Sequence, residues 1–511
     1  MNAWIADSAW ARSLDRRATD EFGVTTRSLM EAAGAAVFDA LVEVLPNKGK
    51  VVVLCGKGNN GGDGFVAARL AHEFQYEVEC LVAAKPGELR GVADEQRVLA
   101  QRAGLKCVFV GDSEYRLRLG ALGEADVVVD ALLGIGAKGE VVGAVREAIE
   151  AANASDKPVI AVDVPSGIEC DTGRELGEAV WALRTVTFGQ PKPFLFAAEG
   201  LEKCGYWSVA KIGFPPQLLE EPTGARLIDA SWVAERLPER LRGSHKGHNG
   251  AVLVVAGSER MPGAAVLAAL GALRAGAGYV GVASVPSVLA AVAAHVPEAV
   301  HLPLARPAEA GPILEEAGRW DAMVVGPGLG DGVDADLSSL FAGWTRPACL
   351  DADALNAIAQ GVVPPSVPTV STPHPGELGR LLGTDAAGIQ ADRFGRARAA
   401  ADTLGRVVLL KGAHSIVASP GQPLLVNRTG NPGMAVAGMG DVLSGVVGTL
   451  LAQGLEPTEA AACAMYWHGL AGDLCAQIQG PIGFSAAEVA HALSKVRAKI
   501  AAACDNDSAS F

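Results

Sequence analysis

One glycine-rich segment of the sequence carries a carboxylate beside the start of an apolar helix. The segment reads Gly438-Met439-Gly440-Asp441, and the apolar run 442–451 follows it. Free backbone N–H groups at a helix start stabilise an anion such as a phosphoryl group. A carboxylate next to them can take a proton from a hydroxyl as a general base. The alternative interpretation is an Asp N-cap on a glycine-rich turn.

Four further polar motifs of the second half each follow a short apolar run. In one of them His374 lies between two prolines, where it could cap a helix or be held rigidly as a ligand contact. In another, Lys411 follows the run 407–410, where it could neutralise phosphate charge or be merely solvated. The motifs are GPGLG (326–330), DADALN (351–356), TPHPGE (372–377) and KGAHS (411–415).

The first half has a glycine-rich segment of its own, CGKGNNGGDG at 55–64, after another apolar run. Its glycines let the backbone approach a ligand closely, and the helix start behind them offers N–H groups to a phosphate. The glycines alone would also fit a tight strand–helix turn. Asn59, Asn60 and Asp63 add polar groups that such a turn does not need, so the segment predicts a ligand site.

Two carboxylates close later apolar runs of the same half. Asp130 ends the run 127–129, and Asp163 ends the run 159–162. Either residue taken alone could be a helix cap. In an open α/β sheet, however, ligands bind beyond the carboxyl ends of the strands. We therefore expect both carboxylates to converge with the glycine-rich segment on one site.

The elements that position these residues are short β-branched runs alternating with helix-compatible stretches, in both halves of the chain. Such alternation predicts an α/β fold with parallel sheets covered on both faces by helices. A helical stretch over 18–45 is expected before the first strand. The expected strands are 51–55, 78–82, 107–110, 127–130, 159–163, 185–188 and 207–209, then 251–256, 279–285, 322–325, 348–350, 369–371 and 407–410.

The segment 213–223 is rich in proline and glutamate, which predicts a linker between two domains. We expect a first domain over 1–222, a second over 223–504 and a flexible tail over 505–511. The 511 residues, half of them apolar, are enough for two sizeable cores.

Composition excludes several classes of protein. A net charge of −14 argues against binding to nucleic acid or to anionic membranes, and no long apolar run predicts a membrane span. The 9 cysteines have no regular spacing, which indicates reduced thiols in the cytoplasm rather than disulfides or a zinc site. The acidic N-terminus does not have the pattern of a signal peptide.

The first half resembles the NAD(P)H-hydrate epimerase domain over roughly residues 10–215, through GNNGGDG (58–64), VDALLGIG (129–136) and VDVPSG (162–167). The resemblance implies a Rossmann-like three-layer domain that binds K⁺ through Asn60, Asp130 and Ser166. It makes Asp163 the candidate for acid–base chemistry at the hemiaminal carbon of the substrate. The substrate contacts that it implies are Asn59, Asn60, Gly61, Gly62, Asp63, Gly134, Ile135, Gly136, Ala137, Lys138, Gly139, Glu140 and Asp163.

The second half resembles the ADP- or ATP-dependent NAD(P)H-hydrate dehydratase domain over roughly residues 225–500. HKGHNG (245–250), PGAA (262–265) and NPGMAVAGMGDVLSG (431–445) carry the likeness with the four motifs above. The resemblance implies a ribokinase-like three-layer domain with Asp441 as catalytic base and Mg²⁺ accompanying ADP or ATP. The implied hydrate contacts are Ala264, Gly328, His374 and Asp441, and the nucleotide contacts are Lys411, Gly412, Ala413, His414, Ser415 and Gly440.

Together the two resemblances imply a bifunctional enzyme, isomerase and lyase, that repairs hydrated NADH and NADPH. We expect the partners to be these hydrates and ADP or ATP, with neither nucleic acid nor membrane, and the chain to form a homo-oligomer. Two alternatives stay open. The residues around Asp441 also permit a small-molecule kinase fused to a nucleotide-binding domain, and the first half could be a binding module without chemistry.

Overall fold

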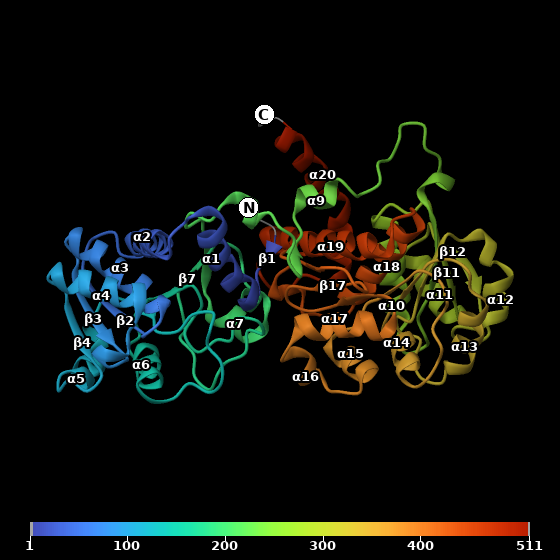
Figure 1. The fold of residues 1–511 in the computed structure, drawn as a ribbon. Coiled ribbons are helices and arrows are strands. Elements are labelled where there is room, and N and C mark those ends of the chain that lie inside the picture. The colour runs from blue at the N-terminus through green and yellow to red at the C-terminus, as the bar shows by residue number, and fades with distance from the viewer. Residues whose placement is uncertain (1–3, 509–511) are drawn as a thin grey trace. The chain divides into compact units, whose positions relative to one another are not determined.

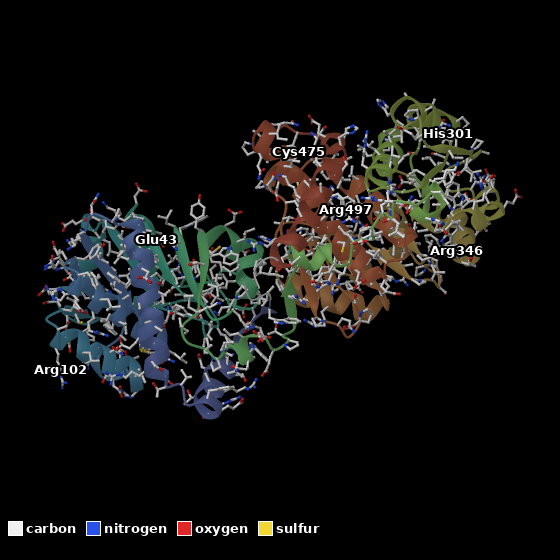
Figure 2. All side chains as sticks on the ribbon, turned by 90° about the horizontal axis from the view of Figure 1, so that it is seen from above. Glu43, Arg102, His301, Arg346, Cys475 and Arg497 are labelled. Carbon is white, nitrogen blue, oxygen red and sulfur yellow. The ribbon has the colours of Figure 1, made fainter. Side chains whose placement is uncertain are left out.

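The computed structural model describes residues 4–508, which form two compact units, 4–225 and 226–508 (Figure 1). The division falls three residues after the predicted boundary at 222. Polar side chains such as Glu43 and Arg102 project from the surface of the first unit, and His301 and Arg346 from that of the second (Figure 2). Within the described residues, no cysteine forms a disulfide, and no helix has both the length and the apolar character needed to cross a bilayer.

The first unit contains a parallel sheet in the order β4-β3-β2-β5-β6-β7-β8. Residues of β2 alternate between two cores: Val51 and Val53 face one, and Val52 and Leu54 face the other. Two buried faces with helices over each make three layers. The strands are β2 (Lys50–Cys55), β3 (Glu77–Val82), β4 (Lys106–Phe109), β5 (Val127–Ala131), β6 (Val159–Val162), β7 (Arg184–Phe188) and β8 (Tyr206–Ala210).

Helices of the first unit differ from the prediction at the N-terminus. The single helical stretch expected over 18–45 is two helices, α1 (Ser8–Phe22) and α2 (Thr26–Val44). Gly23 ends α1 in the left-handed conformation with φ 70°, and Thr25 caps α2 by accepting the Ser28 N–H. The other helices are α3 (Asn59–Glu73), α4 (Gly91–Arg102), α5 (Tyr115–Gly120), α6 (Gly143–Ala154), α7 (Ala198–Lys203) and α8 (Pro216–Leu219).

The predicted linker 213–223 is not an open connection. Its apolar residues Phe214, Leu218 and Leu219 pack with Leu14 of α1 in a small core of the first unit. The composition of the segment hid this packing, because its prolines and glutamates outnumber the three apolar side chains that decide its position.

The second unit has a larger sheet, in which β9 to β18 lie in the order β9-β18-β17-β16-β15-β14-β13-β10-β11-β12. Pairing is parallel from β12 to β16, while β16, β17 and β18 pair antiparallel. The strands are β9 (Ala225–Leu227), β10 (Ala251–Val255), β11 (Tyr279–Ser284), β12 (Val300–Pro303), β13 (Ala322–Val325), β14 (Ala348–Leu350), β15 (Thr369–Ser371), β16 (Val407–Leu410), β17 (Ile416–Ala418) and β18 (Leu424–Val426).

Helices again cover both faces, because Val252 and Val254 of β10 face one core and Leu253 and Val255 the other. Helix α20 continues to Ser508, so 505–508, expected in a flexible tail, are helical; 509–511 lie outside the described residues. The helices are α9 (Ala230–Ala234), α10 (Pro262–Arg274), α11 (Pro286–His295), α12 (Ala310–Glu315), α13 (Asp334–Gly343), α14 (Ala352–Ala359), α15 (Pro375–Leu382), α16 (Ala386–Gln390), α17 (Arg393–Leu404), α18 (Met439–Ala452), α19 (Pro457–Gln479) and α20 (Ala486–Ser508).

Two glycines bring α10 and α18 into close contact. A Cβ atom at Gly271 would lie 2.4 Å from the carbonyl oxygen of Val442, and one at Gly445 would lie 2.1 Å from that of Ala268. The hydroxyl of Thr449 also donates to the carbonyl of Ala272 at 3.1 Å. The backbones of the two helices therefore touch directly along much of α18.

Candidate active sites

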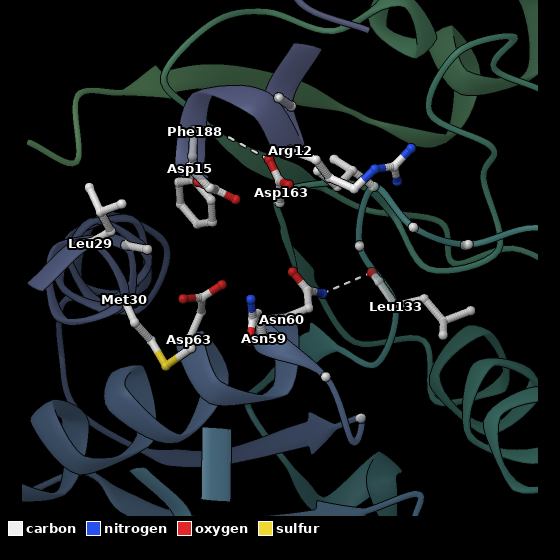
Figure 3. Close-up of a pocket in the computed structure, with 18 of the residues that line it drawn as sticks. Arg12, Asp15, Leu29, Met30, Asn59, Asn60, Asp63, Leu133, Asp163 and Phe188 are labelled. Carbon is white, nitrogen blue, oxygen red and sulfur yellow. Dashed lines mark hydrogen bonds between the residues drawn. The ribbon is translucent and has the colours of Figure 1, made fainter. Parts of the chain in front are cut away.

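A cavity of about 550 Å³ opens at the carboxyl ends of β2, β5 and β6 in the first unit (Figure 3). The β2–α3 turn forms one wall. There a Cβ atom at Gly61 would lie 2.1 Å from the carbonyl oxygen of Gly56, so only glycine fits. The buried helix start after this turn places Asn59, Asn60 and Asp63 against the cavity.

The structure brings most of the predicted substrate contacts together around this cavity. Gly61 and Gly62 do not line it, because they are buried in α3, where Gly62 faces Met30. Lys138, Gly139 and Glu140 do not line it either; they are exposed on the loop after β5. The predicted residues that do line it are Asn59, Asn60, Asp63, Gly134, Ile135, Gly136, Ala137 and Asp163.

Asp163 follows β6 with a positive φ of 63°, an uncommon conformation for a residue other than glycine. Its Oδ1 accepts hydrogen bonds from the Thr187 hydroxyl at 2.9 Å and the Phe188 N–H at 3.2 Å. The Nζ of Lys192 lies 2.8 Å from the same oxygen. All these partners hold Oδ1, which leaves Oδ2 for a ligand.

Two charged residues that interact with Asp163 were missed in the sequence. Lys192 lies in the loop after β7, with its side chain only 2 % exposed. Asp15 comes from α1 and lines the same cavity. The side chain of Asp15 keeps contact with solvent, yet the protein around it raises its pKa to about 6, and Asp163 adds repulsion. The signal for Lys192 was its place between Pro191 and Pro193 just after a strand.

The three predicted ion ligands lie along one chain of hydrogen bonds. Asn60 Nδ2 donates to the carbonyl of Leu133 at 2.8 Å, and the Leu133 N–H donates to Ser166 Oγ at 2.8 Å. Ser166 Oγ donates to Asp130 Oδ1 at 2.6 Å, and the Ser166 N–H donates to Oδ2 at 2.8 Å. The structure therefore brings Asn60, Asp130 and Ser166 together.

Asp130 is completely buried, and burial raises its pKa to about 6 despite the hydrogen bonds from Ser166 and Leu132. It forms no ion pair with any residue in 4–508. A buried carboxylate without a cationic partner, close to amide and hydroxyl oxygens, is a donor set that suits a hard monovalent cation. The residues present therefore fit K⁺.

The site of the second unit lies at the start of α18. Gly438 takes a φ of 91° as the N-cap, and Asp441 lies in the first turn of the helix. Burial raises the pKa of Asp441 to about 7, with repulsion from Asp351 adding to it and Lys411 opposing it. Such a carboxyl can exchange a proton near neutral pH, as a general base must.

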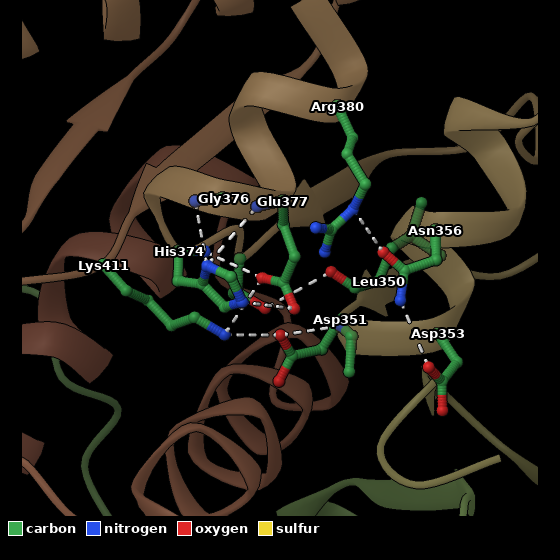
Figure 4. A network of polar contacts seen from close by, with 11 residues as sticks. Leu350, Asp351, Asp353, Asn356, His374, Gly376, Glu377, Arg380 and Lys411 are labelled. Carbon is green, nitrogen blue, oxygen red and sulfur yellow. Dashed lines mark hydrogen bonds and ion pairs between the residues drawn. The ribbon is translucent and has the colours of Figure 1, made fainter. Parts of the chain in front are cut away.

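Lys411 directly follows β16, and its side chain lies beside the start of α18 (Figure 4). Its Nζ lies 2.7 Å from Asp351 Oδ1 and 3.7 Å from Glu377 Oε2. A Cβ atom at Gly440 would lie 3.2 Å from the same Nζ, so the ammonium is next to the helix start. Burial lowers the pKa of Lys411, but Asp351 and Glu377 outweigh burial, and the net shift is upward.

His374 acts as a helix cap in this structure. Its Nδ1 accepts the N–H groups of Gly376 at 3.0 Å and Glu377 at 3.4 Å, and α15 begins at Pro375. The side chain of His374 is 52 % exposed, and its Nε2 lies 3.4 Å from Glu377 Oε1. The cap fixes the ring and leaves it open to a ligand on the exposed side.

The other predicted contacts fall into two groups. Gly328 has a φ of 62°, and a Cβ atom there would lie 2.7 Å from the Cβ of Ala264, so these two residues are neighbours. The predicted nucleotide contacts Lys411, Gly412, Ala413, His414 and Ser415 form the connection from β16 to β17, where His414 Nδ1 lies 2.9 Å from the Asn427 carbonyl oxygen.

A second cavity, of about 560 Å³, was not predicted; it is lined by the loop after β13 and by residues of α14 and α15. Asp353 lines it, accepting the Gly330 N–H at 2.8 Å and the Asn356 side chain at 3.2 Å. Arg380 also lines it and donates to Asn356 Oδ1 at 3.0 Å. The DADALN and GPGLG motifs were the signal that could have predicted it, because both motifs contribute to its wall.

Two family models match the chain. The model described as YjeF-related protein N-terminus matches residues 26–194, and the model described as NAD(P)H-hydrate dehydratase matches 252–495. The bifunctional NAD(P)H-hydrate repair enzyme Nnr of Moorella thermoacetica is 40 % identical over 494 residues, which are 93 % of this chain and 93 % of that protein. The chain belongs to this family. The enzyme of the same name from Escherichia coli is 35 % identical over 496 residues, covering 96 % of this chain and 93 % of that protein.

Solved structures resemble the second unit. A ribokinase-like superfamily protein from Enterococcus faecalis is 25 % identical, covers 54 % of this chain and 97 % of its own, and has a TM-score of 0.50. An ADP/ATP-dependent NAD(P)H-hydrate dehydratase from Bacillus subtilis, co-crystallised with ATP/Mg²⁺, is 31 % identical over 53 % of this chain and 97 % of its own, with a TM-score of 0.48. The predicted fold class, Rossmann-like followed by ribokinase-like, is confirmed.

Proposed function

We propose that the chain repairs hydrated NADH and NADPH in two steps. The first unit interconverts the R and S hydrates, and the second unit dehydrates the S hydrate with ADP or ATP. The observation that carries this proposal is that this one chain matches both family models and aligns with bifunctional repair enzymes over nearly its full length.

For the second unit, the geometry around Asp441 favours activation of a hydroxyl. Hydroxide is a poor leaving group, whereas phosphate is a good one. Asp441 would take the proton of the hydrate's hydroxyl while the phosphoryl group of ADP or ATP moves onto that oxygen. The N–H groups of residues 438–440 and the Lys411 ammonium, with Mg²⁺ brought by the nucleotide, would stabilise the moving phosphoryl charge. Loss of phosphate, together with a proton from the adjacent ring carbon, then restores the dihydronicotinamide, and AMP remains when ADP is the donor.

For the first unit, Asp163 would perform the acid–base step at the hemiaminal carbon, inside the cavity. Bound K⁺ would supply a fixed positive charge for the oxygen atoms of the substrate. Asn60, Asp130 and Ser166 would hold that ion, for the reasons of burial and donor type given above.

One assay tests both steps. The full chain is mixed with ADP, Mg²⁺ and racemic NADH hydrate, and the absorbance of the dihydronicotinamide is followed. Complete conversion, with release of free phosphate, supports both activities. Conversion of the S fraction alone at a fast rate would make the first unit a binding module. A stable phosphorylated product without dihydronicotinamide would instead make the second unit a small-molecule kinase.

A further inference from the structure

Two carboxylates, Asp63 and Asp163, face the cavity of the first unit from opposite walls (Figure 3). Asp63 comes from the first turns of α3, and Asp163 follows β6 on the other side. Inversion at a single carbon requires a bond to break on one face and to form on the other. Carboxyl groups on opposite sides of a bound ring are therefore placed for such a reaction.

The environment of Asp63 favours its neutral form. Asp63 is 9 % exposed, and its side chain has no hydrogen-bond or ion-pair partner within residues 4–508. Burial raises the pKa of Asp63 well above its usual range, and repulsion from Asp163 and Asp15 adds to that shift. A neutral carboxylic acid that points into a cavity can donate a proton there.

The environment of Asp163 is the opposite, because a buried ammonium stabilises its negative charge. Lys192 Nζ lies 2.8 Å from Asp163 Oδ1 and also donates to the Thr187 hydroxyl at 2.8 Å and the Phe188 carbonyl at 2.9 Å. These contacts fix the ammonium beside Asp163. Two carboxyl groups held in different charge states can serve as acid and base at the same pH.

We propose that Asp63 and Asp163 are a catalytic acid–base pair that epimerises the hydrate by loss and readdition of water on opposite faces of the nicotinamide ring. Lys192 is the positioning residue that holds Asp163. This inference rests on the proposed epimerase function of the first unit and adds a second catalytic residue and a reaction course to it.

The reaction balances without any oxidant or reductant. Neutral Asp63 gives its proton to the hydroxyl of the hemiaminal carbon, the C–O bond breaks, and one water leaves. The lone pair of the ring nitrogen forms a C=N⁺ bond. A second water adds to the same carbon from the other face and gives a proton to the Asp163 carboxylate. The opposite inversion runs through the same steps with the two carboxyl groups exchanging roles, and proton exchange with solvent resets the site.

The first experiment compares Asp63→Asn with Glu73→Gln in the full chain. Both changes remove a carboxyl from α3, but Glu73 is exposed and outside the cavity. Asp63→Asn should reduce kcat of epimerisation about 10²–10⁴-fold, the usual loss for a general acid, while Glu73→Gln keeps the wild-type rate. Asparagine keeps the size of the side chain, and unchanged dehydration of the S hydrate by the same protein shows that the chain is folded.

The split between kcat and KM tests the positioning role of Lys192. Lys192→Met should lower kcat of epimerisation and leave KM near the wild-type value, because Asp163 Oδ1 loses the ammonium that holds it, whereas Lys192→Arg should restore kcat. The other charged side chains around the cavity are Arg12, Asp15, Lys57 and Glu88. An unchanged kcat in Lys192→Met, or a loss that Lys192→Arg does not restore, would show that the lysine is only structural, and would overturn its part in the proposal.

Isotope labelling tests the reaction course. In H₂¹⁸O, each inverted hydrate should carry one solvent oxygen, since the original hydroxyl leaves as water. Inverted product that retains its ¹⁶O would overturn the proposal in favour of ring opening. If the wild-type chain leaves the R hydrate unconverted, the proposed function itself fails. If the wild type epimerises but Asp63→Asn stays within threefold of it, only the acid–base pair is wrong.

Discussion

Lys411 Nζ lies 2.7 Å from Asp351 Oδ1, and this ion pair joins the ends of β16 and β14, the two strands on either side of β15, beside the start of α18. The pair affects the chemistry of a third residue. Asp351 raises the pKa of Asp441 and Lys411 lowers it, with burial as the largest cause, and the result is a carboxyl with a pKa of about 7. The pKa of Lys411 itself is shifted upward, so its side chain is a charged ammonium next to the proposed phosphoryl site.

The first prediction concerns Asp441 as the catalytic base. Asp441→Ala should reduce the dehydration rate at least about 10²–10⁴-fold, because base catalysis acts on the reaction step. Nucleotide binding, measured by calorimetry, should stay near that of the wild type. Epimerisation by the same variant is the internal control and should not change. Dehydration within a few-fold of the wild type would remove Asp441 from the mechanism.

The second prediction concerns stability against pH. The pKa of Asp441 is about 7 in the folded chain and 3.8 in the unfolded reference, so ionising it costs free energy only in the folded state. Its contribution to stability is present below pH 3.8 and is lost as pH rises through about 7. Asp441→Asn should therefore be more stable than wild type by about 1–3 kcal/mol at pH 8 and equal to it near pH 4.

Thermal unfolding at both pH values measures this difference, with Asp402→Asn on an exposed face of α17 as the control. An equal gain at pH 4 and pH 8 would contradict the upward shift of the Asp441 pKa.

The third prediction concerns Gly438, whose φ of 91° strains any other residue. Gly438→Ala should lower stability by about 1–2 kcal/mol. It should also lower the dehydration rate, because a Cβ atom would lie 2.4 Å from Leu267 and displace the N–H groups at the helix start.

Gly454 follows the other end of α18 with a φ of 88° and open space around its Cβ position, so Gly454→Ala is a matched control. It should lose stability while the dehydration rate stays normal. Equal rates in both variants would contradict the anion site.

The fourth prediction concerns K⁺. Epimerisation should require K⁺. Asp130→Asn should lower the affinity for K⁺, since Asp130 is the one formal negative charge among the three proposed ligand side chains. The rate is measured against K⁺ concentration in a choline buffer, and heavy monovalent ions are soaked into crystals. A full rate without K⁺ or Na⁺, together with no ion density at Asn60, Asp130 and Ser166, would show that the ion site is wrong.

The fifth prediction concerns the two units. Each buries its own cores on both faces of its own sheet, so fragments 1–224 and 225–511 should fold separately. The second fragment alone should consume the S hydrate quickly and then slow to the spontaneous epimerisation rate. Adding the first fragment should restore the fast phase, because the intermediate diffuses. Folded fragments whose mixture stays slow would contradict a separable epimerase.

The sequence predicted the residues that stand at the ends of apolar runs. Asp163 and Asp441 belong to this group, because a β-branched run or an apolar helix defines where the chain reaches the edge of a sheet. Lys192 and Asp15 could not be found this way. Asp15 lies on a polar helix face, and nothing in helical periodicity tells which polar residue of that face meets a cavity formed by strands far along the chain.

Very short strands could not be predicted from the sequence either. Strands β17 and β18 have three residues each, too few for a period-2 pattern, so the antiparallel pairing of β17 with β16 and with β18 was not expected. That pairing turns the KGAHS segment into a hairpin connection. The site residues in it were predicted from their motif, while the reason for their position came only from the fold.

The close packing of α10 on α18 limits how this enzyme can change its specificity. Asp441 sits at the end of a helix whose first turns lie directly against the backbone of another helix, with no side-chain layer that could rearrange between them. Shifting or tilting α18 to suit a different substrate would need both helices to move together. New specificity is therefore accessible through the loops after β13, β14 and β15, which can vary in length and composition while the base keeps its place.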